Sequence, residues 1–260
     1  MTILKPFLIL LFCLSFVRAA HAEVFRYFDE EGTLIVTDNP FGTKKRDRQQ
    51  YHKKEDRNTN VKLKFREDIS YEFYEVSGKT FHDVLAATER VGPFDAREGR
   101  HYAGQTRWNF GLSYNMDFNY RLEGDLIVAS VQIHNIDFRS DITVILPALS
   151  ENSSFELPDF KAWEGFLQQL AEHEDDHVRI VREPRYRQEV ISGISGIREM
   201  TLHSQADANA EALLKDAIDS KIGAVAHDVM KKIKEKNDEY DMLTRHGEKP
   251  EFRNAFFQRL

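Results

Sequence analysis

Apolar and polar residues alternate along several short segments in the first half of the chain, which is the pattern of half-buried β-strands. The alternation predicts a hairpin over residues 23–40, with Glu30-Glu31-Gly32 at its turn, and a strand from Tyr71 to Val76. Between these strands and the next, Thr80 is suited to begin a helix that ends before Gly92. Three further strands are predicted at Gln105–Tyr114, Leu126–Phe138 and Asp141–Leu146.

After Pro158 the apolar positions recur every three or four residues, which is the spacing of one helix face. Pro158 and Asp159 suit a first helical turn, and Pro184 is expected to end the helix. A second run, from Thr201 to about Leu243, predicts a long helix or helix pair with a bend near Gly223. The chain is therefore expected to be α+β, with an antiparallel or mixed sheet packed on the first long helix. The apolar stripe of that helix comprises Trp163, Phe166, Leu170, His173, His177 and Ile180.

The first 22 residues have the features of a secretory signal: Lys5, an apolar run from Phe7 to Val17, and small residues up to Ala22. The run is short for a membrane span, so no stable membrane anchor is expected after cleavage. The sequence thus predicts a periplasmic or secreted protein. Its expected organisation is a signal peptide (1–22), a small hairpin module (23–42), a polar linker (43–66), a main domain (67–250) and a C-terminal tail (251–260).

Composition narrows the classes of function. The 260 residues are 41% hydrophobic and 30% charged, which suits a globular protein and excludes a disordered or fibrous chain. The net charge of −7 argues against a general nucleic-acid binder. The only cysteine, Cys13, lies in the predicted signal peptide. Metal chemistry in the mature protein must therefore rest on histidine and carboxylate side chains.

The apolar stripe of the first long helix contains His173-Glu174-Asp175-Asp176-His177, a match to the H-E-x-x-H pattern. Imidazoles four residues apart project from one helix face and can bind one Zn²⁺, while Glu174 can reach a water on the metal. Zinc lowers the pKa of such a water to about 7, and the carboxylate can take its proton for attack on a peptide carbonyl. Asp175 and Asp176 are expected to be solvated. The alternative is a pair of ordinary core histidines with hydrogen-bond partners.

A catalytic zinc site usually has three protein ligands, so a third ligand must come from elsewhere in the chain. The extended metzincin pattern is excluded, because Ile180 and Glu183 stand where it requires glycine and histidine. The candidates are Glu183, Glu189, Glu199, His203, Asp207, Glu211, His227, Asp241 and His246. Of these, His203 and His227 are expected to be surface or packing residues. The second helical run ends in Tyr240-Asp241-x-x-Thr244-x-His246-Gly247, where the glycine permits a turn.

Other motifs accompany these two elements, in the order Tyr74-x-Val76-x-Gly78, Gly92-Pro93, Thr106-x-Trp108, Tyr114, Leu146-Pro147 and Trp163-x-x-Phe166. On these motifs, the chain from Tyr71 to Gly247 resembles a bacterial family of predicted secreted zinc-dependent proteases that was first catalogued as a domain of unknown function. The resemblance implies that His173 and His177 bind zinc and that Glu174 is the general base. It also implies that the Tyr-Asp-x-x-Thr-x-His-Gly element forms a second part of the site.

The hairpin segment carries Tyr27, Asp29-Glu30-Glu31-Gly32 and Thr37-Asp38-Asn39-Pro40. With these residues it resembles a small domain of unknown function found near the N-termini of many exported bacterial proteins. The resemblance does not indicate what that module binds.

For the third ligand we favour His246, because a neutral imidazole suits zinc and the turn at Gly247 could direct it back to the metal helix. Asp241 is the rival ligand, or else the acceptor that orients a ligating imidazole. Tyr240 is a candidate to stabilise the oxyanion, with a packing aromatic as the alternative.

The sequence as a whole predicts a zincin-like peptidase of the H-E-x-x-H type, acting on peptides or proteins in the cell envelope or outside it. The alternative is a non-catalytic envelope binding protein that retains a structural or vestigial zinc site. A metal carrier fits less well, because Glu174 has no ligand role there and no histidine-rich tract is present.

Overall fold

A computed structural model describes residues 25–28, 34–37, 63, 65–96, 98–151, 153–203 and 209–260. The predicted signal peptide lies outside these residues, and the predicted linker is described only at Leu63, Phe65 and Arg66. Within the described part of the chain, no helix is both long enough and apolar enough to cross a lipid bilayer.

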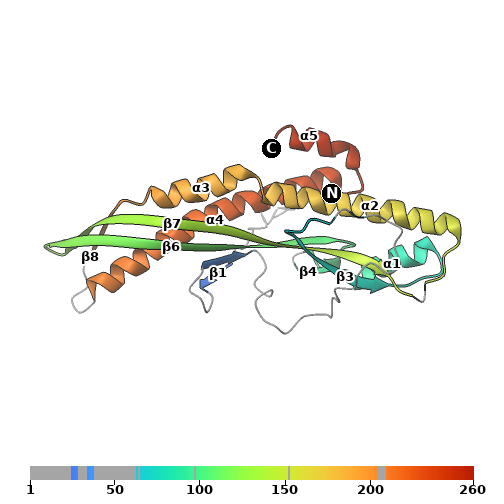
Figure 1. Cartoon of the computed structure of the whole chain (residues 1–260), viewed down its shortest axis with the longest axis horizontal. Coiled ribbons are helices and arrows are strands. Elements are labelled where there is room, and N and C mark those ends of the chain that lie inside the picture. The colour runs from blue at the N-terminus through green and yellow to red at the C-terminus, as the bar shows by residue number, and fades with distance from the viewer. Residues whose placement is uncertain are drawn as a thin grey trace, which may run out of the picture.

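The sheet is built on a long antiparallel hairpin of β6 (Gln105–Glu123) and β7 (Leu126–Leu149), which gives the molecule its elongated shape (Figure 1). The described strands form a six-stranded sheet in the order β1-β2-β6-β7-β3, with β8 also paired to β7. Parallel pairing of β3 with β7 makes the sheet mixed. The other strands are β1 (Phe25–Phe28), β2 (Leu34–Thr37), β3 (Ser70–Val76), β8 (Glu199–His203), and the separate pair β4 (Phe94–Asp95) and β5 (Arg100–His101).

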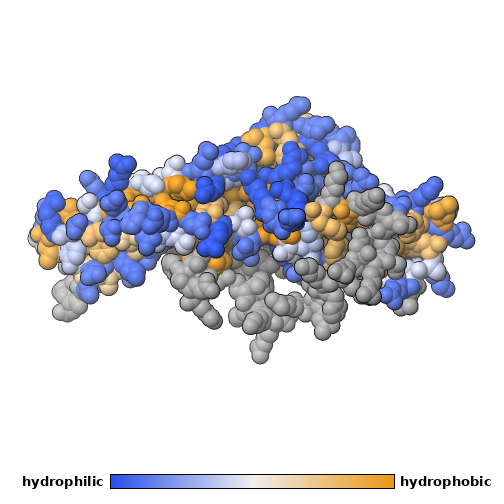
Figure 2. Space-filling model, in the orientation of Figure 1, coloured by the Kyte–Doolittle hydropathy of each residue, from blue (hydrophilic) through white to orange (hydrophobic). Residues whose placement is uncertain are grey.

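Two helices, α2 (Leu157–Val181) and α3 (Pro184–Ser195), lie along the β6–β7 hairpin (Figure 1). A third, α4 (Ala210–Thr244), packs on α2, α3 and β2. The chain ends in the short helices η2 (Pro250–Phe252) and α5 (Arg253–Phe257), which pack on α4. α1 (Phe81–Val91) packs against β3 and α2. Hydrophilic side chains cover most of the described face seen in Figure 2, and apolar ones show in the region of α5. The α+β class predicted from the sequence is confirmed.

Local signals explain the starts of two helices. Thr80 caps α1: its hydroxyl accepts a hydrogen bond from the Asp83 amide, and the Asp83 carboxylate accepts one from the Thr80 amide. Pro158 lies in the first turn of α2, where its missing N–H is not needed. The apolar stripe of α2 is confirmed, because Trp163, His173 and His177 are all buried.

The N-terminal hairpin joins the main sheet. β2 pairs antiparallel with β6, so that Leu34–Thr37 lies opposite Asn109–Leu112. Leu34 and Val36 are 2% and 1% exposed and belong to the main hydrophobic core. The hairpin is therefore packed as part of the folded body.

Several boundaries differ from the sequence prediction. β6 runs beyond Tyr114 to Glu123, and β7 is one continuous strand where two were predicted, because the two strands pair with each other along nearly their whole length. The prediction that helix begins at Thr201 was wrong, since residues 199–203 form β8 and pair with the start of β7. Of the predicted long helix or helix pair, the structure has one continuous helix, α4, which runs through Gly223 and buries it. α3 was not predicted.

Candidate metal centre

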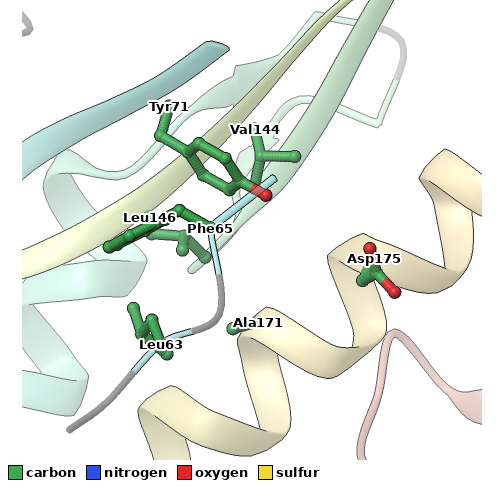
Figure 3. A pocket seen from close by; sticks show the side chains of 7 residues that line it. All are labelled: Leu63, Phe65, Tyr71, Val144, Leu146, Ala171 and Asp175. Atoms are coloured by element: carbon green, nitrogen blue, oxygen red, sulfur yellow. The ribbon is translucent and has the colours of Figure 1, made fainter. Parts of the chain in front are cut away.

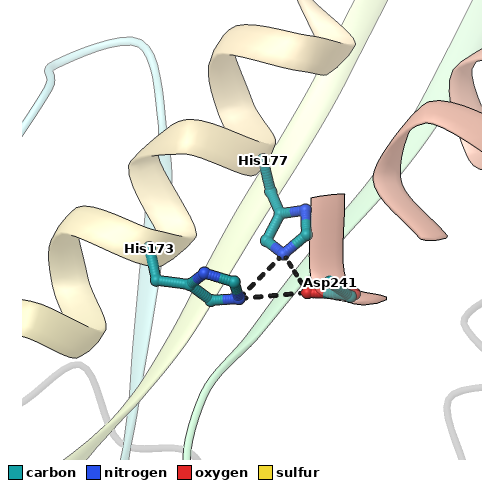
Figure 4. A group of neighbouring side chains, drawn as sticks. All are labelled: His173, His177 and Asp241. Atoms are coloured by element: carbon teal, nitrogen blue, oxygen red, sulfur yellow. Dashed lines mark hydrogen bonds and ion pairs between the residues drawn. The ribbon is translucent and has the colours of Figure 1, made fainter. Parts of the chain in front are cut away.

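Two helices bring three metal-ligand side chains together. His173 and His177 project from one face of α2, and Asp241 lies in the last turn of α4 (Figure 4). The Asp241 Oδ1 atom is 3.1 Å from His173 Nε2 and 3.0 Å from His177 Nε2, and the two Nε2 atoms are 3.2 Å apart. We call these residues the metal group, because their ligand atoms are close enough to hold one metal ion.

The hydrogen bonds of Asn237 determine which nitrogen of His177 faces the group. The Asn237 side-chain amide donates to the Ile233 carbonyl at 2.8 Å, which turns its Oδ1 atom toward His177 Nδ1 at 2.7 Å. His177 Nδ1 must therefore carry the hydrogen and donate it. In the neutral ring, Nε2 then has a lone pair directed at Asp241 and His173, as a metal ligand requires.

Charge within the group favours a cation. Burial alone would lower the pKa of His177, but the Asp241 carboxylate and, to a smaller extent, Glu174 and Asn237 raise it to about 9. The two histidines in turn hold the pKa of Asp241 well below its ordinary value despite its burial. At neutral pH, Nε2 of His177 therefore carries a proton when no metal is bound, and a divalent cation would replace that proton.

The donor set fits a metal ion such as zinc. Ligand atoms about 2.0–2.2 Å from a zinc ion lie roughly 3–3.6 Å from each other, which is close to the separations in the metal group. The side chains of His173, His177 and Asp241 are 6%, 10% and 26% exposed, so their ligand atoms are largely withdrawn from water. Among the described residues, no fourth histidine, cysteine or carboxylate joins the group.

Glu174 lies beside the group and is held by the sheet. Its side chain is buried, and its Oε2 atom accepts a hydrogen bond of 2.7 Å from the Thr106 hydroxyl on β6. Its Oε1 atom faces Gly104, where an added Cβ would stand only 2.6 Å away. The carboxylate is therefore fixed in position by residues that precede and begin β6.

Tyr240 is fully buried, and its ring packs against both histidines. The ring stacks on His173 with centroids 5.1 Å apart and meets His177 edge-on at 5.3 Å. Its hydroxyl donates to Asp176 Oδ2 at 2.5 Å. Burial and this bond raise the pKa of the hydroxyl well above its ordinary value. These contacts give Tyr240 a packing role; the oxyanion role remains a prediction.

The expectation that Asp176 is solvated was wrong. Its side chain is 0% exposed and accepts hydrogen bonds from Tyr240, Arg179 and Arg253. The partners from α4 and α5 are more than sixty residues away in sequence, so the local acidic run gave no sign of them. Asp175, by contrast, is 47% exposed and lies 3.5 Å from the Arg66 guanidinium.

His246 stands next to the metal group but is not part of it. Arg245, His246 and Gly247 have φ values of 50°, 53° and 88°, so α4 ends in a left-handed turn. The turn places His246 Nδ1 3.7 Å from Asp241 Oδ1, with its ring 4.8 Å from that of Tyr102. Gly247 lies against His173, where an added Cβ would be 3.1 Å from Cγ. The structure thus brings the rival candidate, Asp241, into contact with both histidines.

The sequence profile of a family described as bacterial protein of unknown function (DUF922) matches residues 71–247, which is more than half of the chain. The chain belongs to this family. A second profile, described as domain of unknown function (DUF4124), matches residues 11–63. No curated protein and no solved structure matches the chain.

All residues of the metal group lie inside the DUF922 match, and residues 248–260 lie outside it. Within this DUF922 domain, the sequence analysis missed Thr106 and Asn237 as partners of the site. Asn237 had a detectable signal, because it precedes Asp241 by four residues and so shares its helix face. Thr106 stands in the Thr106-x-Trp108 motif, but nothing in that motif indicated its contact with Glu174, which depends on how β6 meets α2.

An apolar hollow of about 40 Å³ lies between α2 and the sheet of this DUF922 protein (Figure 3). It is lined by Leu63, Phe65, Tyr71, Val144, Leu146, Ala171 and Asp175. None of the metal group lines it, so it is separate from the metal site.

Proposed function

We propose that this protein is an exported zinc-dependent peptidase, zincin-like in its arrangement of a sheet and an H-E-x-x-H helix. Its substrates would be peptides or proteins in the cell envelope or outside it. One observation carries the proposal: a three-ligand metal group stands beside a buried, positioned glutamate that ligates nothing.

The number of ligands supports an enzyme over a structural site. Structural zinc sites are usually closed by four protein ligands, whereas catalytic sites have three and leave one position for water or substrate. The three residues of the metal group are the complete set among the described residues. His246, the nearest further histidine, is 35% exposed and borders the group on the Asp241 side.

A zinc ion bound in this group would supply a Lewis acid and a water of low pKa. Glu174 would accept a proton from that water and deliver it to the departing amine nitrogen. Thr106 would keep the carboxylate oriented for this transfer through its hydrogen bond to Oε2. Asn237 would hold His177 in the tautomer that leaves Nε2 free.

The conservative variant Glu174→Gln tests the proposal. It preserves side-chain size and removes the base, so zinc should stay bound while hydrolysis of a peptide library, followed by mass spectrometry, is lost. General-base removal typically costs on the order of 10²–10⁴ in rate. Glu189→Gln, at an exposed ion pair with Lys232 on the outer surface, is the matched control and should remain active. Full activity of Glu174→Gln would exclude the assigned base.

Deep burial of the two histidines favours a second candidate, a non-catalytic binding protein with a structural or vestigial metal site. His173 and His177 are 6% and 10% exposed, so little of either ring is accessible to a substrate. This candidate predicts that the zinc-loaded wild-type protein binds metal stoichiometrically yet cleaves no member of the library. Cleavage that disappears in Glu174→Gln would reject it.

A further inference from the structure

The two helices that supply the metal group are joined by a hydrogen bond immediately beside the ligands. Asp176 precedes the ligand His177 on α2, and Tyr240 precedes the ligand Asp241 on α4. The Tyr240 hydroxyl donates to Asp176 Oδ2 at 2.5 Å, and both side chains are fully buried. The bond therefore fixes the spacing of α2 and α4 at the level of the metal group.

Residues 250–260, which we call the C-terminal segment, cover this bond. Arg253 Nε donates to the same Asp176 oxygen that Tyr240 contacts, and its Nη1 atom donates to Glu172 Oε2 at 2.7 Å. Phe256 is 3% exposed, and its ring is 5.1 Å from that of Tyr240. Phe257 packs 5.8 Å from Tyr240 and lies under the Arg179 guanidinium. The segment thus separates the Asp176–Tyr240 bond from solvent.

The same segment closes the space next to His173. A hollow of about 10 Å³ lies there, and its walls include Pro250 and Arg253 together with His173 and Tyr240. The segment is anchored further along, where Arg185 on α3 donates to the Leu260 main-chain oxygen at 2.5 Å. The segment also lies beyond the DUF922 match, so the family description does not include it.

We propose that the C-terminal segment is a functional part of the metal centre, in which Arg253 is a positioning residue that keeps the Asp176–Tyr240 bond intact and thereby sets the ligand geometry. The inference rests on the metal site proposed above. Arg253 acts in two ways. Its charge balances the buried Asp176 carboxylate. Its fork geometry lets Nε donate to Asp176 while the two Nη atoms donate to Glu172, one turn earlier on α2, so that the guanidinium is fixed beside the Asp176–Tyr240 bond. Without it, the Tyr240 ring loses its fixed position against the two histidines.

The zinc affinity of the full-length protein tests the proposal. It is measured on the metal-free protein by competition with a chelator, at a temperature well below that of unfolding. Arg253→Met should weaken zinc binding about ten- to hundredfold, the range seen when the outer partners of metal ligands are removed. Arg253→Lys keeps the positive charge but lacks the branched guanidinium, so its zinc affinity should lie between those of Arg253→Met and wild type. Arg259→Met is the matched control, because Arg259 lies in the same segment and its guanidinium donates only to the Ala255 carbonyl among the bonds described.

The absorption spectrum of the Co²⁺-loaded proteins provides a second readout that a purely structural role would not alter. The spectrum of Arg253→Lys should differ from that of wild type, and the Arg259→Met spectrum should not. If Arg253→Met does not fold, the zinc affinity and the Co²⁺ spectrum of Arg253→Lys alone test the inference. Unchanged zinc affinity and an unchanged Co²⁺ spectrum, even with a lower unfolding temperature, would overturn the inference. Absence of zinc binding by wild type would instead overturn the proposed metal site.

Discussion

His177 donates a hydrogen bond from Nδ1 to Asn237 Oδ1 over 2.7 Å, inside a buried contact between α2 and α4. Because the Asn237 amide is itself fixed by the Ile233 carbonyl, this bond specifies the ring nitrogen that faces Asp241. Asn237 precedes Asp241 by one helical turn. A single face of α4 therefore supplies both the third ligand candidate and the partner that orients the second.

Removing the Asn237 acceptor should weaken metal binding. Asn237→Leu leaves His177 Nδ1 buried without a partner, so zinc affinity should fall about ten- to hundredfold. Asn237→Asp retains the acceptor and should keep or increase the affinity. Isothermal titration of zinc into the metal-free proteins measures both. Equal affinities for Asn237→Leu and wild type would show that this bond does not orient the ligand.

The two candidates for third ligand are separable by metal analysis. Asp241→Ala removes an atom that lies within 3.1 Å of both histidine Nε2 atoms, so zinc affinity should fall by more than the roughly hundredfold maximum typical of outer partners. His246→Ala should retain one zinc per chain after dialysis. The reverse pattern, with zinc lost only in His246→Ala, would assign the ligand to His246.

Enzyme kinetics can test whether Thr106 positions Glu174, the proposed general base. Thr106→Val removes the hydroxyl that donates to Glu174 Oε2, and should lower kcat about ten- to hundredfold without loss of zinc. Thr106→Ser restores the hydroxyl and should restore most of the rate. A loss that Thr106→Ser does not recover would point to packing on β6 and not to the hydrogen bond.

Zinc binding should strengthen as the pH rises toward 9. His177 has a pKa raised to about 9, so below that pH a metal ion must displace its proton. Loss of one proton makes the affinity rise roughly tenfold per pH unit up to that pKa. Chelator competition between pH 6 and pH 9 measures the slope, and a flat profile over this range would contradict the proton competition.

The metal-free protein should show the opposite trend in stability. The His177–Asp241 pair stabilises the fold fully below the ordinary histidine pKa of about 6.5, and this contribution is lost as the pH rises through about 9. Thermal unfolding of the metal-free protein should therefore shift to lower temperature across that window. In Asp241→Asn the shift should be smaller.

Docking of the N-terminal hairpin predicts a stability effect far from the metal group. Leu34 is 2% exposed in the main core, so Leu34→Ala should lower the free energy of unfolding by about 2–4 kcal/mol. Ile35, its partly buried neighbour, points to the other face of the sheet, and Ile35→Ala should cost less. Denaturant unfolding of both variants measures the difference. Equal small effects would indicate that the hairpin is not packed on β6.

Local patterns in the sequence were sufficient to predict α2 and its histidine pair. The apolar stripe repeats at helical spacing over the whole helix, and His173 and His177 fall on it, so no distant contact was needed. The alternation of β6 and β7 likewise predicted strands, although the extent of β7 depended on pairing with β6.

Features that depend on distant contacts escaped prediction. The turn that places His246 beside the metal group begins at Arg245, whose left-handed φ of 50° is uncommon for a residue other than glycine. The burial of Asp176 depends on Arg253, and the strand β8 depends on pairing with β7. For Asp176 and for β8, the partner that decides the structure lies outside any local window.

Diffraction from crystals of the zinc-loaded protein, collected at the zinc absorption edge, tests the central claim most directly. We expect one strong anomalous peak, from a zinc ion bonded to Nε2 of His173, Nε2 of His177 and an Asp241 carboxylate oxygen, with Glu174 nearby but not bonded and no fourth protein ligand. A peak elsewhere, or a zinc ion coordinated by four protein side chains, would contradict the proposed catalytic metal site.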